Sequence, residues 1–103
     1  MSRYTYPVTF EPDEDTVIAQ FPDVPEAHTQ GADETDALYQ ANDCLIAALG
    51  AYIELRRDIP RPSPARGRLV VTVPPLAAAK LALYQAMREA NMTNVALAKR
   101  LGV

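Results

Sequence analysis

The chain's only histidine, His28, follows two acids, Asp23 and Glu26, in the segment FPDVPEAHTQG. An imidazole oriented by a carboxylate is a common general acid–base pair, so this segment is a candidate catalytic loop. A catalyst also needs a nucleophile or a group that holds substrate, and none stands out nearby. Because Pro22 and Pro25 fix φ and lack an N–H, we expect an irregular connection here. The sequence therefore favours a polar His28 on a short strand after that connection, with catalysis as the alternative.

A second candidate is the acidic run EPDED, which contributes Glu11, Asp13, Glu14 and Asp15. A calcium-binding EF-hand loop needs a central glycine and a distant glutamate, and this run has neither. A two-metal nuclease would need carboxylates from separate strands, for which Asp23 and Asp43 are the nominees. Three interpretations remain open: a solvated hairpin tip, an acidic patch for a partner, and a metal site. We expect no metal and no cofactor.

The charges are divided unequally along the 103 residues, although the net charge is only −3. Residues 1–60 hold twelve acids against three arginines, a charge of −9, whereas residues 61–103 hold seven bases against one acid, a charge of +6. This asymmetry predicts an acidic surface for a basic partner and a basic surface for a polyanion. The alternative is that the two halves attract each other.

Composition narrows the class of protein further. No apolar run approaches the roughly 20 residues that span a bilayer, and the N-terminus lacks the pattern of a secretory signal. Cys44 is the only cysteine, so an internal disulfide or a cysteine-based metal cluster is excluded. We therefore expect a cytoplasmic protein without membrane contact, made of one compact domain or of one small domain plus a short appendage, in which Cys44 is a core side chain.

The pattern of the first 74 residues predicts a two-layer α+β domain in the order β-β-β-α-β. Strands are expected at 3–10 and 16–21 around a turn centred on Pro12, and a brief third strand at 26–31. Asp33 is a natural N-cap for the helix that follows. The apolar face of this helix comprises Leu38, Ala41, Leu45, Ala48, Leu49 and Tyr52. Residues 59–68 form a proline-rich linker inside the domain, and RLVVTV returns as the fourth strand.

Residues 75–103 are expected to form a helical segment of two short helices. The first begins at Pro75 and stops at Asn91, and the second begins at the N-cap Thr93 and stops at Gly102. Leu76, Leu83 and Met87 give the first helix an apolar face, which predicts a homo-oligomer, either dimer or tetramer. The tyrosines are Tyr4, Tyr6, Tyr39, Tyr52 and Tyr84, and their spacing favours core or interface positions over stacking on bases.

The stretch YPVTFEPDEDTVIAQFPDVPEAHTQG, the helix after it and the exit IPRPS resemble the HicB antitoxin family over about residues 4–64. The tail LALYQAMREANMTNVALAKRLGV is similar to the start of the helix-turn-helix that many members carry. The resemblance implies a degenerate ribonuclease-H-like domain without that fold's catalytic acids, and hence no enzyme activity. It also implies a HicA-like partner, a small basic ribonuclease toxin that cleaves mRNA, and operator DNA that controls the operon.

The resemblance and the charges together nominate two sets of site residues. The toxin-binding set is Glu11, Asp13, Glu14, Asp15 and Asp23. The DNA-binding set is Thr93, Asn94, Lys99 and Arg100. The second set is expected to contact phosphates only, because the recognition helix that reads bases would begin where the sequence ends. The alternatives are a stand-alone transcription regulator, whose first domain oligomerises or senses a ligand, and a small metal-dependent nuclease.

Overall fold

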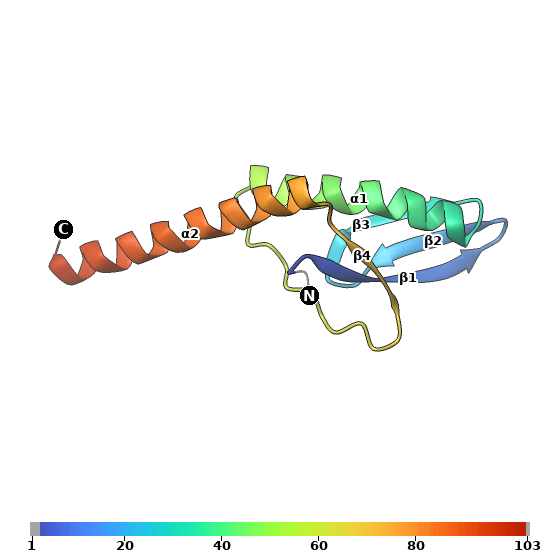
Figure 1. The fold of residues 1–103 in the computed structure, drawn as a ribbon, viewed down its shortest axis with the longest axis horizontal. Helices are drawn as coiled ribbons and strands as arrows, with labels where there is room; N and C mark the ends of the chain where they lie inside the picture. Colours follow the sequence, from blue (N-terminus) through green and yellow to red (C-terminus); the bar gives the residue numbers. More distant parts are fainter. Residues whose placement is uncertain (1–2, 103) are drawn as a thin grey trace.

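Four strands and two helices make up the protein in its computed structural model, which describes residues 3–102 (Figure 1). The side chains of residues 92–95 and 97 lie outside this description. The elements are β1 (Thr5–Asp13), β2 (Thr16–Phe21), β3 (Val24–Gly31), α1 (Glu34–Glu54), β4 (Leu69–Thr72) and α2 (Pro75–Leu101). The predicted α+β class and the order β-β-β-α-β are confirmed.

The four strands form one antiparallel sheet in the order β3-β2-β1-β4. β1 pairs with β4 through residues 5–8 and with β2 through residues 9–13. Tyr6 and Val8 of β1 belong to the core that the sheet shares with α1, which covers one face, and Pro7 between them is buried as well. The helix contributes Ala37, Ala41, Leu45, Leu49 and Tyr52 to this core. Helix and sheet therefore make the two layers that the periodicity predicts.

The start of α1 is fixed by two reciprocal hydrogen bonds. Asp33 Oδ1 accepts from the backbone N–H of Asp36 at 2.8 Å, and Asp36 Oδ2 accepts from the backbone N–H of Ala32 at 2.8 Å. These carboxylates satisfy backbone donors that have no partner within the helix and lie at the positive end of its dipole. The prediction of Asp33 as the N-cap is confirmed.

Two proline predictions in the strands are wrong. Pro12 is not in the turn but in β1, opposite Val17, and Pro25 is inside β3 rather than in an irregular connection. Residues 9–13 pair with β2 alone, so the backbone of Pro12 has no strand on its other side. Pro25 lies on edge strand β3, at an irregularity where the pairing with β2 shifts from Gln20–His28 to Phe21–Val24. A residue without an N–H is tolerated at such an edge. β1 and β3 are consequently longer than predicted, whereas β2 has the predicted bounds; β2 and β3 are joined by a two-residue turn at Pro22 and Asp23.

The predicted break in the C-terminal helices is also wrong, because α2 is continuous from Pro75 to Leu101. Residues 76–101 contain neither glycine nor proline, and one asparagine costs only about 0.6 kcal/mol in a helix. Thr93 is part of the helix rather than an N-cap. Gly102 does end the helix, with φ 76° in the left-handed region that glycine adopts without strain.

The first half of α2 is anchored to the domain. Leu81 is buried, Tyr84 Oη donates to the Arg57 carbonyl at 2.7 Å, and Arg88 Nη2 donates to Asp58 Oδ1 at 2.7 Å. Beyond Arg88 the described side chains are exposed or half-buried, and the helix projects from the domain (Figure 1). The molecule is therefore 61 Å long and only 26 Å by 22 Å across. The domain boundary between residues 74 and 75 stays a prediction.

Candidate functional site: the acidic end

The β1–β2 hairpin tip carries the predicted acidic run, and all of its carboxylates are exposed. These are the side chains of Glu11, Asp13, Glu14 and Asp15. The backbone pairing between β1 and β2 ends at Asp13 and Thr16, where Thr16 Oγ1 donates to the Asp13 carbonyl at 2.9 Å. Glu14 closes the turn with φ 54°, in the left-handed region. The tip presents four negative charges on a short, tightly closed turn.

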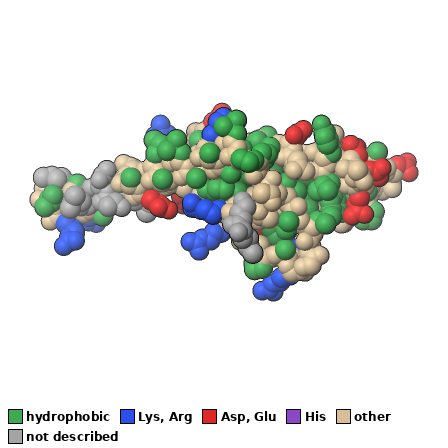
Figure 2. Space-filling model, in the orientation of Figure 1, with side chains coloured by type: hydrophobic (Ala, Val, Ile, Leu, Met, Phe, Trp, Pro, Cys, Tyr) green, Lys and Arg blue, Asp and Glu red, His purple; other side chains and the backbone are tan. Residues whose placement is uncertain are grey.

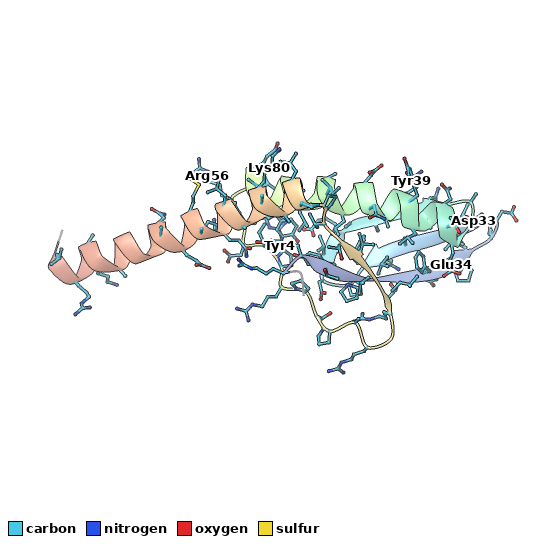
Figure 3. All side chains as sticks on the ribbon, viewed as in Figure 1. Tyr4, Asp33, Glu34, Tyr39, Arg56 and Lys80 are labelled. Carbon is cyan, nitrogen blue, oxygen red and sulfur yellow. The ribbon has the colours of Figure 1, made fainter. Side chains whose placement is uncertain are left out.

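The N-terminus of α1 adds acids at the same end of the molecule. Because β3 runs back beside β2, Gly31 pairs with Val17, close to the hairpin tip. Asp33 and Glu34 follow directly and lie near that tip (Figure 3). Acidic side chains gather there on the visible surface (Figure 2). We call the hairpin tip together with Asp33, Glu34 and Asp36 the acidic end.

The contribution of α1 to the acidic end was missed by sequence reasoning, which used its acids only as helix caps. The predicted order of three antiparallel strands could have indicated that these acids lie near the hairpin tip. A third antiparallel strand must end beside the start of the second, so whatever follows it lies near the first turn.

Asp23, the fifth nominated toxin-binding residue, is not part of the acidic end. It lies beyond the opposite end of β2, where its Oδ2 accepts from the backbone N–H of Ser63 at 2.8 Å and from Ser63 Oγ at 2.9 Å. The carboxylate thereby ties the β2–β3 turn to the proline-rich linker. Asp23 has a structural partner within the chain, whereas the acids of the hairpin tip face solvent.

The carboxylates near His28 also have other partners. Glu26 Oε1 accepts from Tyr52 Oη at 2.6 Å, and Glu26 Oε2 accepts from Arg57 Nη1 at 2.8 Å. The hydrogen bond from the Tyr52 hydroxyl has the largest effect on the pKa of Glu26, and the bond from Arg57 the next largest. Together they lower this pKa to about 2. The His28 side chain is exposed on edge strand β3. With Asp23 and Glu26 engaged elsewhere, nothing in this arrangement supports a catalytic role for His28.

We expect His28→Ala to leave both folding and partner binding nearly unchanged, because the side chain is exposed and neither candidate carboxylate is bonded to it. Surface substitutions of this kind usually change stability by less than about 0.5 kcal/mol. Thermal unfolding and binding titrations of the variant test this. Loss of binding by a folded variant would show that His28 belongs to an interface.

Glu26 should make stability depend on acid pH. Its pKa is lowered on folding, so its contribution is complete above the unfolded value near 4.3 and is lost as the pH falls towards 2. We therefore expect Glu26→Gln to be less stable than the parent at pH 6, and the gap to close between pH 4.5 and pH 2. Urea denaturation across this range measures the gap. A gap of constant size would mean that Glu26 does not titrate as the geometry indicates.

Among residues 3–102, omitting side chains not described, no three His, Cys, Asp or Glu groups converge as metal ligands would. The nominated partners of the acidic run lie elsewhere: Asp43 is on α1, and Asp23 is beyond the far end of β2. The hairpin tip alone does not surround an ion. In the same described part of the chain, no helix is long and apolar enough to cross a membrane.

The nominated DNA-binding residues lie far from the acidic end. Lys99 and Arg100 are exposed in the last turn of α2, at the other end of the long axis (Figures 1 and 2). The side chains of Thr93 and Asn94 lie outside the described residues. Of the tyrosines, Tyr4, Tyr6 and Tyr52 are buried in the core and offer no ring for a base to stack on. The acidic end and the exposed pair Lys99 and Arg100 thus lie at opposite ends of the molecule, whereas β4, which also belongs to the basic half of the sequence, pairs with β1 in the sheet.

The fold and this surface can now be compared with known proteins. The family described as HicB_like antitoxin of bacterial toxin-antitoxin system matches residues 5–82. The crystal structure of the N-terminal domain of Burkholderia pseudomallei antitoxin HicB is similar, with a TM-score of 0.55 and 20% sequence identity. That likeness covers 68% of this chain and 95% of that one. The fold is therefore that of an antitoxin N-terminal domain.

Proteins of similar sequence are antitoxins of the same name. Antitoxin HicB 2 of Photorhabdus laumondii is 44% identical over 97 residues, which cover 94% of this chain and 69% of that protein. Antitoxin HicB 1 of the same organism is 42% identical over 99 residues, with 63% of its length covered. Antitoxin HicB of Escherichia coli K12 is 37% identical, with 72% covered. The chain belongs to the HicB-like antitoxin family, and it spans about two thirds of the length of these relatives.

Proposed function

We propose that this antitoxin acts in the cytoplasm by binding a small basic ribonuclease of the HicA type and covering the face on which that enzyme holds mRNA. The observation that carries the proposal is the acidic end, where the hairpin tip and the α1 N-terminus bring exposed carboxylates together. A surface that binds the RNA backbone is basic, and an acidic protein surface of matching shape competes for it. Inhibition is then steric and electrostatic and needs no catalysis by the antitoxin.

Operator binding receives less support from this chain. Lys99 and Arg100 are exposed and can contact phosphates, but phosphate contacts position a protein without reading bases. A helix-turn-helix also needs a turn, and α2 has none between Pro75 and Leu101. We therefore confine the proposal to the toxin.

Co-expression tests the proposal. The chain should co-purify with a co-expressed small basic ribonuclease of the HicA type, and RNA cleavage by that protein should disappear in the complex. Stable complex formation with undiminished cleavage would exclude a covering mode of inhibition. Failure to bind would favour the alternative of a stand-alone regulator.

A further inference from the structure

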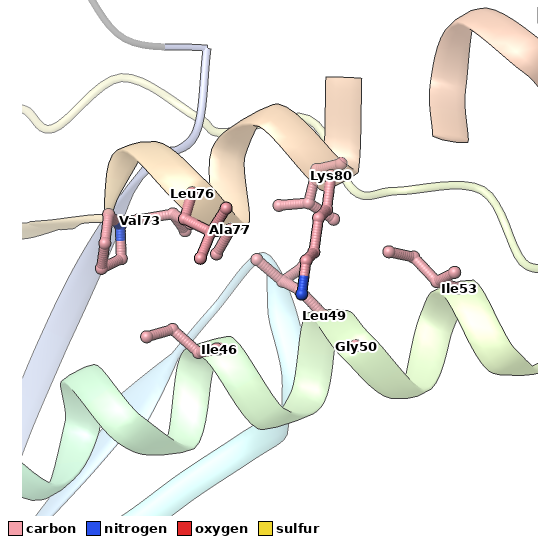
Figure 4. Close-up of a pocket in the computed structure, with 10 residues that line it drawn as sticks. Ile46, Leu49, Gly50, Ile53, Val73, Leu76, Ala77 and Lys80 are labelled. Atoms are coloured by element: carbon pink, nitrogen blue, oxygen red, sulfur yellow. The ribbon is translucent and has the colours of Figure 1, made fainter. Parts of the chain in front are cut away.

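A groove between α1 and α2 has almost wholly apolar walls (Figure 4). It is lined from α1 by Ile46, Leu49 and Ile53, and from α2 by Leu76, Ala77 and Leu81. Its volume of about 400 Å³ lies within the range of pockets that bind small molecules. The Leu76 side chain is 73% exposed, so apolar surface of the groove is in contact with water. Removing that surface from water would favour the binding of an apolar group.

Gly50 leaves the groove open on the α1 side. It also lines the groove, and a Cβ at this position would meet no atom within 4 Å. Glycine is unfavourable in a helix interior, and no close contact within the described chain requires it here. A hydrocarbon chain can therefore lie directly against the helix backbone at this point, and such a ligand would give the glycine a role.

Lys80 is the only charged residue among the described residues that line the groove. Its side chain reaches from α2 across the groove towards Leu49 and Gly50 (Figure 4). Within residues 3–102, apart from the side chains that are not described, no carboxylate forms an ion pair with it. A cation at an apolar groove and without a counter-ion favours a ligand that has an apolar body and a negative group.

The N-terminus of α2 adds positive potential beside the same groove. Pro74, the N-cap, lines the groove, and its side chain accepts no hydrogen bond from the first backbone N–H groups of the helix. The first turn contains no acidic residue either. The partial positive charge of this helix end is therefore not neutralised by a carboxylate of that turn, and together with Lys80 it selects an anion over a cation.

We propose that the groove binds an amphipathic carboxylate, a small molecule with one carboxylate group on a flexible hydrocarbon chain. The hydrocarbon chain packs between Leu49 and Leu81 and over the backbone of Gly50. The carboxylate faces the ammonium group of Lys80. A monovalent carboxylate suits this site better than a phosphate, because phosphates are held by several donors, such as arginine forks or rows of backbone N–H groups. The groove offers a single ammonium group.

The ligand contacts both helices at once. Because it binds only where α1 and α2 lie together, it stabilises the packing of the first half of α2 on the domain by mass action. The inference does not rest on the proposed function, since it requires neither toxin nor operator. Leu83 and Met87, two of the residues from which a homo-oligomer is predicted, do not line the groove, so that prediction is separate.

Decanoate, used below the concentration at which it forms micelles, is the probe. Calorimetric titration of the whole chain should show one site with a dissociation constant on the order of 100 μM. Decyltrimethylammonium has a hydrocarbon chain of the same length and the opposite charge, and it should bind about fivefold more weakly or not at all. Absence of decanoate binding, or equal affinity for the two probes, would overturn the proposal.

A side chain added at Gly50 tests where decanoate binds. Gly50→Leu fills part of the groove without a clash at its Cβ, and we expect the dissociation constant for decanoate to rise about tenfold or more. Ala51→Leu is the matched control, because it adds the same side chain at the next, exposed position, which does not line the groove. Its affinity should equal that of the parent, and native circular dichroism checks the folding of both variants. Equal weakening by both substitutions, or by neither, would place decanoate outside the groove.

Reversing the charge at Lys80 tests the recognition of the carboxylate. Lys80 is exposed, so Lys80→Glu should fold as the parent does. We expect this variant to bind decyltrimethylammonium more tightly than decanoate, which reverses the order found with the parent. An unchanged preference for decanoate would show that Lys80 does not face the carboxylate and would overturn the proposed binding mode.

Discussion

Gly31→Ala is expected to destabilise the fold by about 3–5 kcal/mol, a large share of the 5–15 kcal/mol typical of a small domain. Gly31 ends β3 directly before α1, and the two elements approach closely there. A Cβ at this position would lie 2.3 Å from the backbone N of Ala37 and 2.7 Å from its Cα. Backbone atoms cannot rotate away as side-chain atoms can, so α1 would have to shift off the sheet. Urea denaturation should show a much lower midpoint.

Gly50→Ala is the matched control for this prediction. Gly50 lies within α1, where an added Cβ meets nothing within 4 Å, and alanine is favoured over glycine in a helix by up to about 1 kcal/mol. We expect this variant to be more stable than the parent when both are measured at concentrations low enough to be monomeric. If the two substitutions had the same sign and size, the close approach at Gly31 would not be what requires glycine.

Replacing Asp13, Glu14 and Asp15 with serine is expected to slow association with a basic toxin about tenfold at low ionic strength, because exposed charges steer encounter. The dependence of the on-rate on salt should weaken at the same time, since screening acts over about 10 Å at 0.1 M salt. Stopped-flow or surface-based kinetics at several salt concentrations measures both effects. Stability should change little because all three side chains are exposed.

The control for the hairpin tip is a variant with the same change in net charge elsewhere. Asp43 and Glu54 are exposed on α1, away from the hairpin, and Asp43→Lys combined with Glu54→Ser changes the net charge by the same three units. This variant should reduce the on-rate much less. Equal slowing by both variants would mean that overall charge, rather than the acidic end, attracts the partner.

The element types could be predicted from the sequence because they depend on neighbours in the chain. The alternation in β2 and the 3.6-residue period of α1 are local patterns, and the N-cap at Asp33 is a bond over three residues. The local rules failed where the outcome depended on pairing. Pro12 and Pro25 are turn residues by propensity. Only the register of β1 shows that Pro12 lies beyond the part paired with β4, and only the sheet order shows that Pro25 is on an edge strand.

The predicted end of the helix at Asn91 was also wrong. Asn91 is only a weak stop signal, and the residues around it include neither glycine nor proline, so the helix continues. The four acids of the hairpin tip were visible as one run of sequence. Asp23 was grouped with them by its charge and the family resemblance, yet the length of β2 separates it from the tip.

The sequence by itself determined the fold class, the family fingerprint and the division of charge between the halves, because composition and periodicity are properties of the chain alone. The tertiary structure decided which residues lie next to those charges. It placed the α1 N-terminus next to the hairpin tip, engaged Glu26 with Tyr52 and Arg57, and aligned α1 with α2 so that Leu49 and Leu81 line an apolar groove between the two helices. Each of these depends on contacts between residues distant in sequence, which form only when burial of the common core fixes the elements in place.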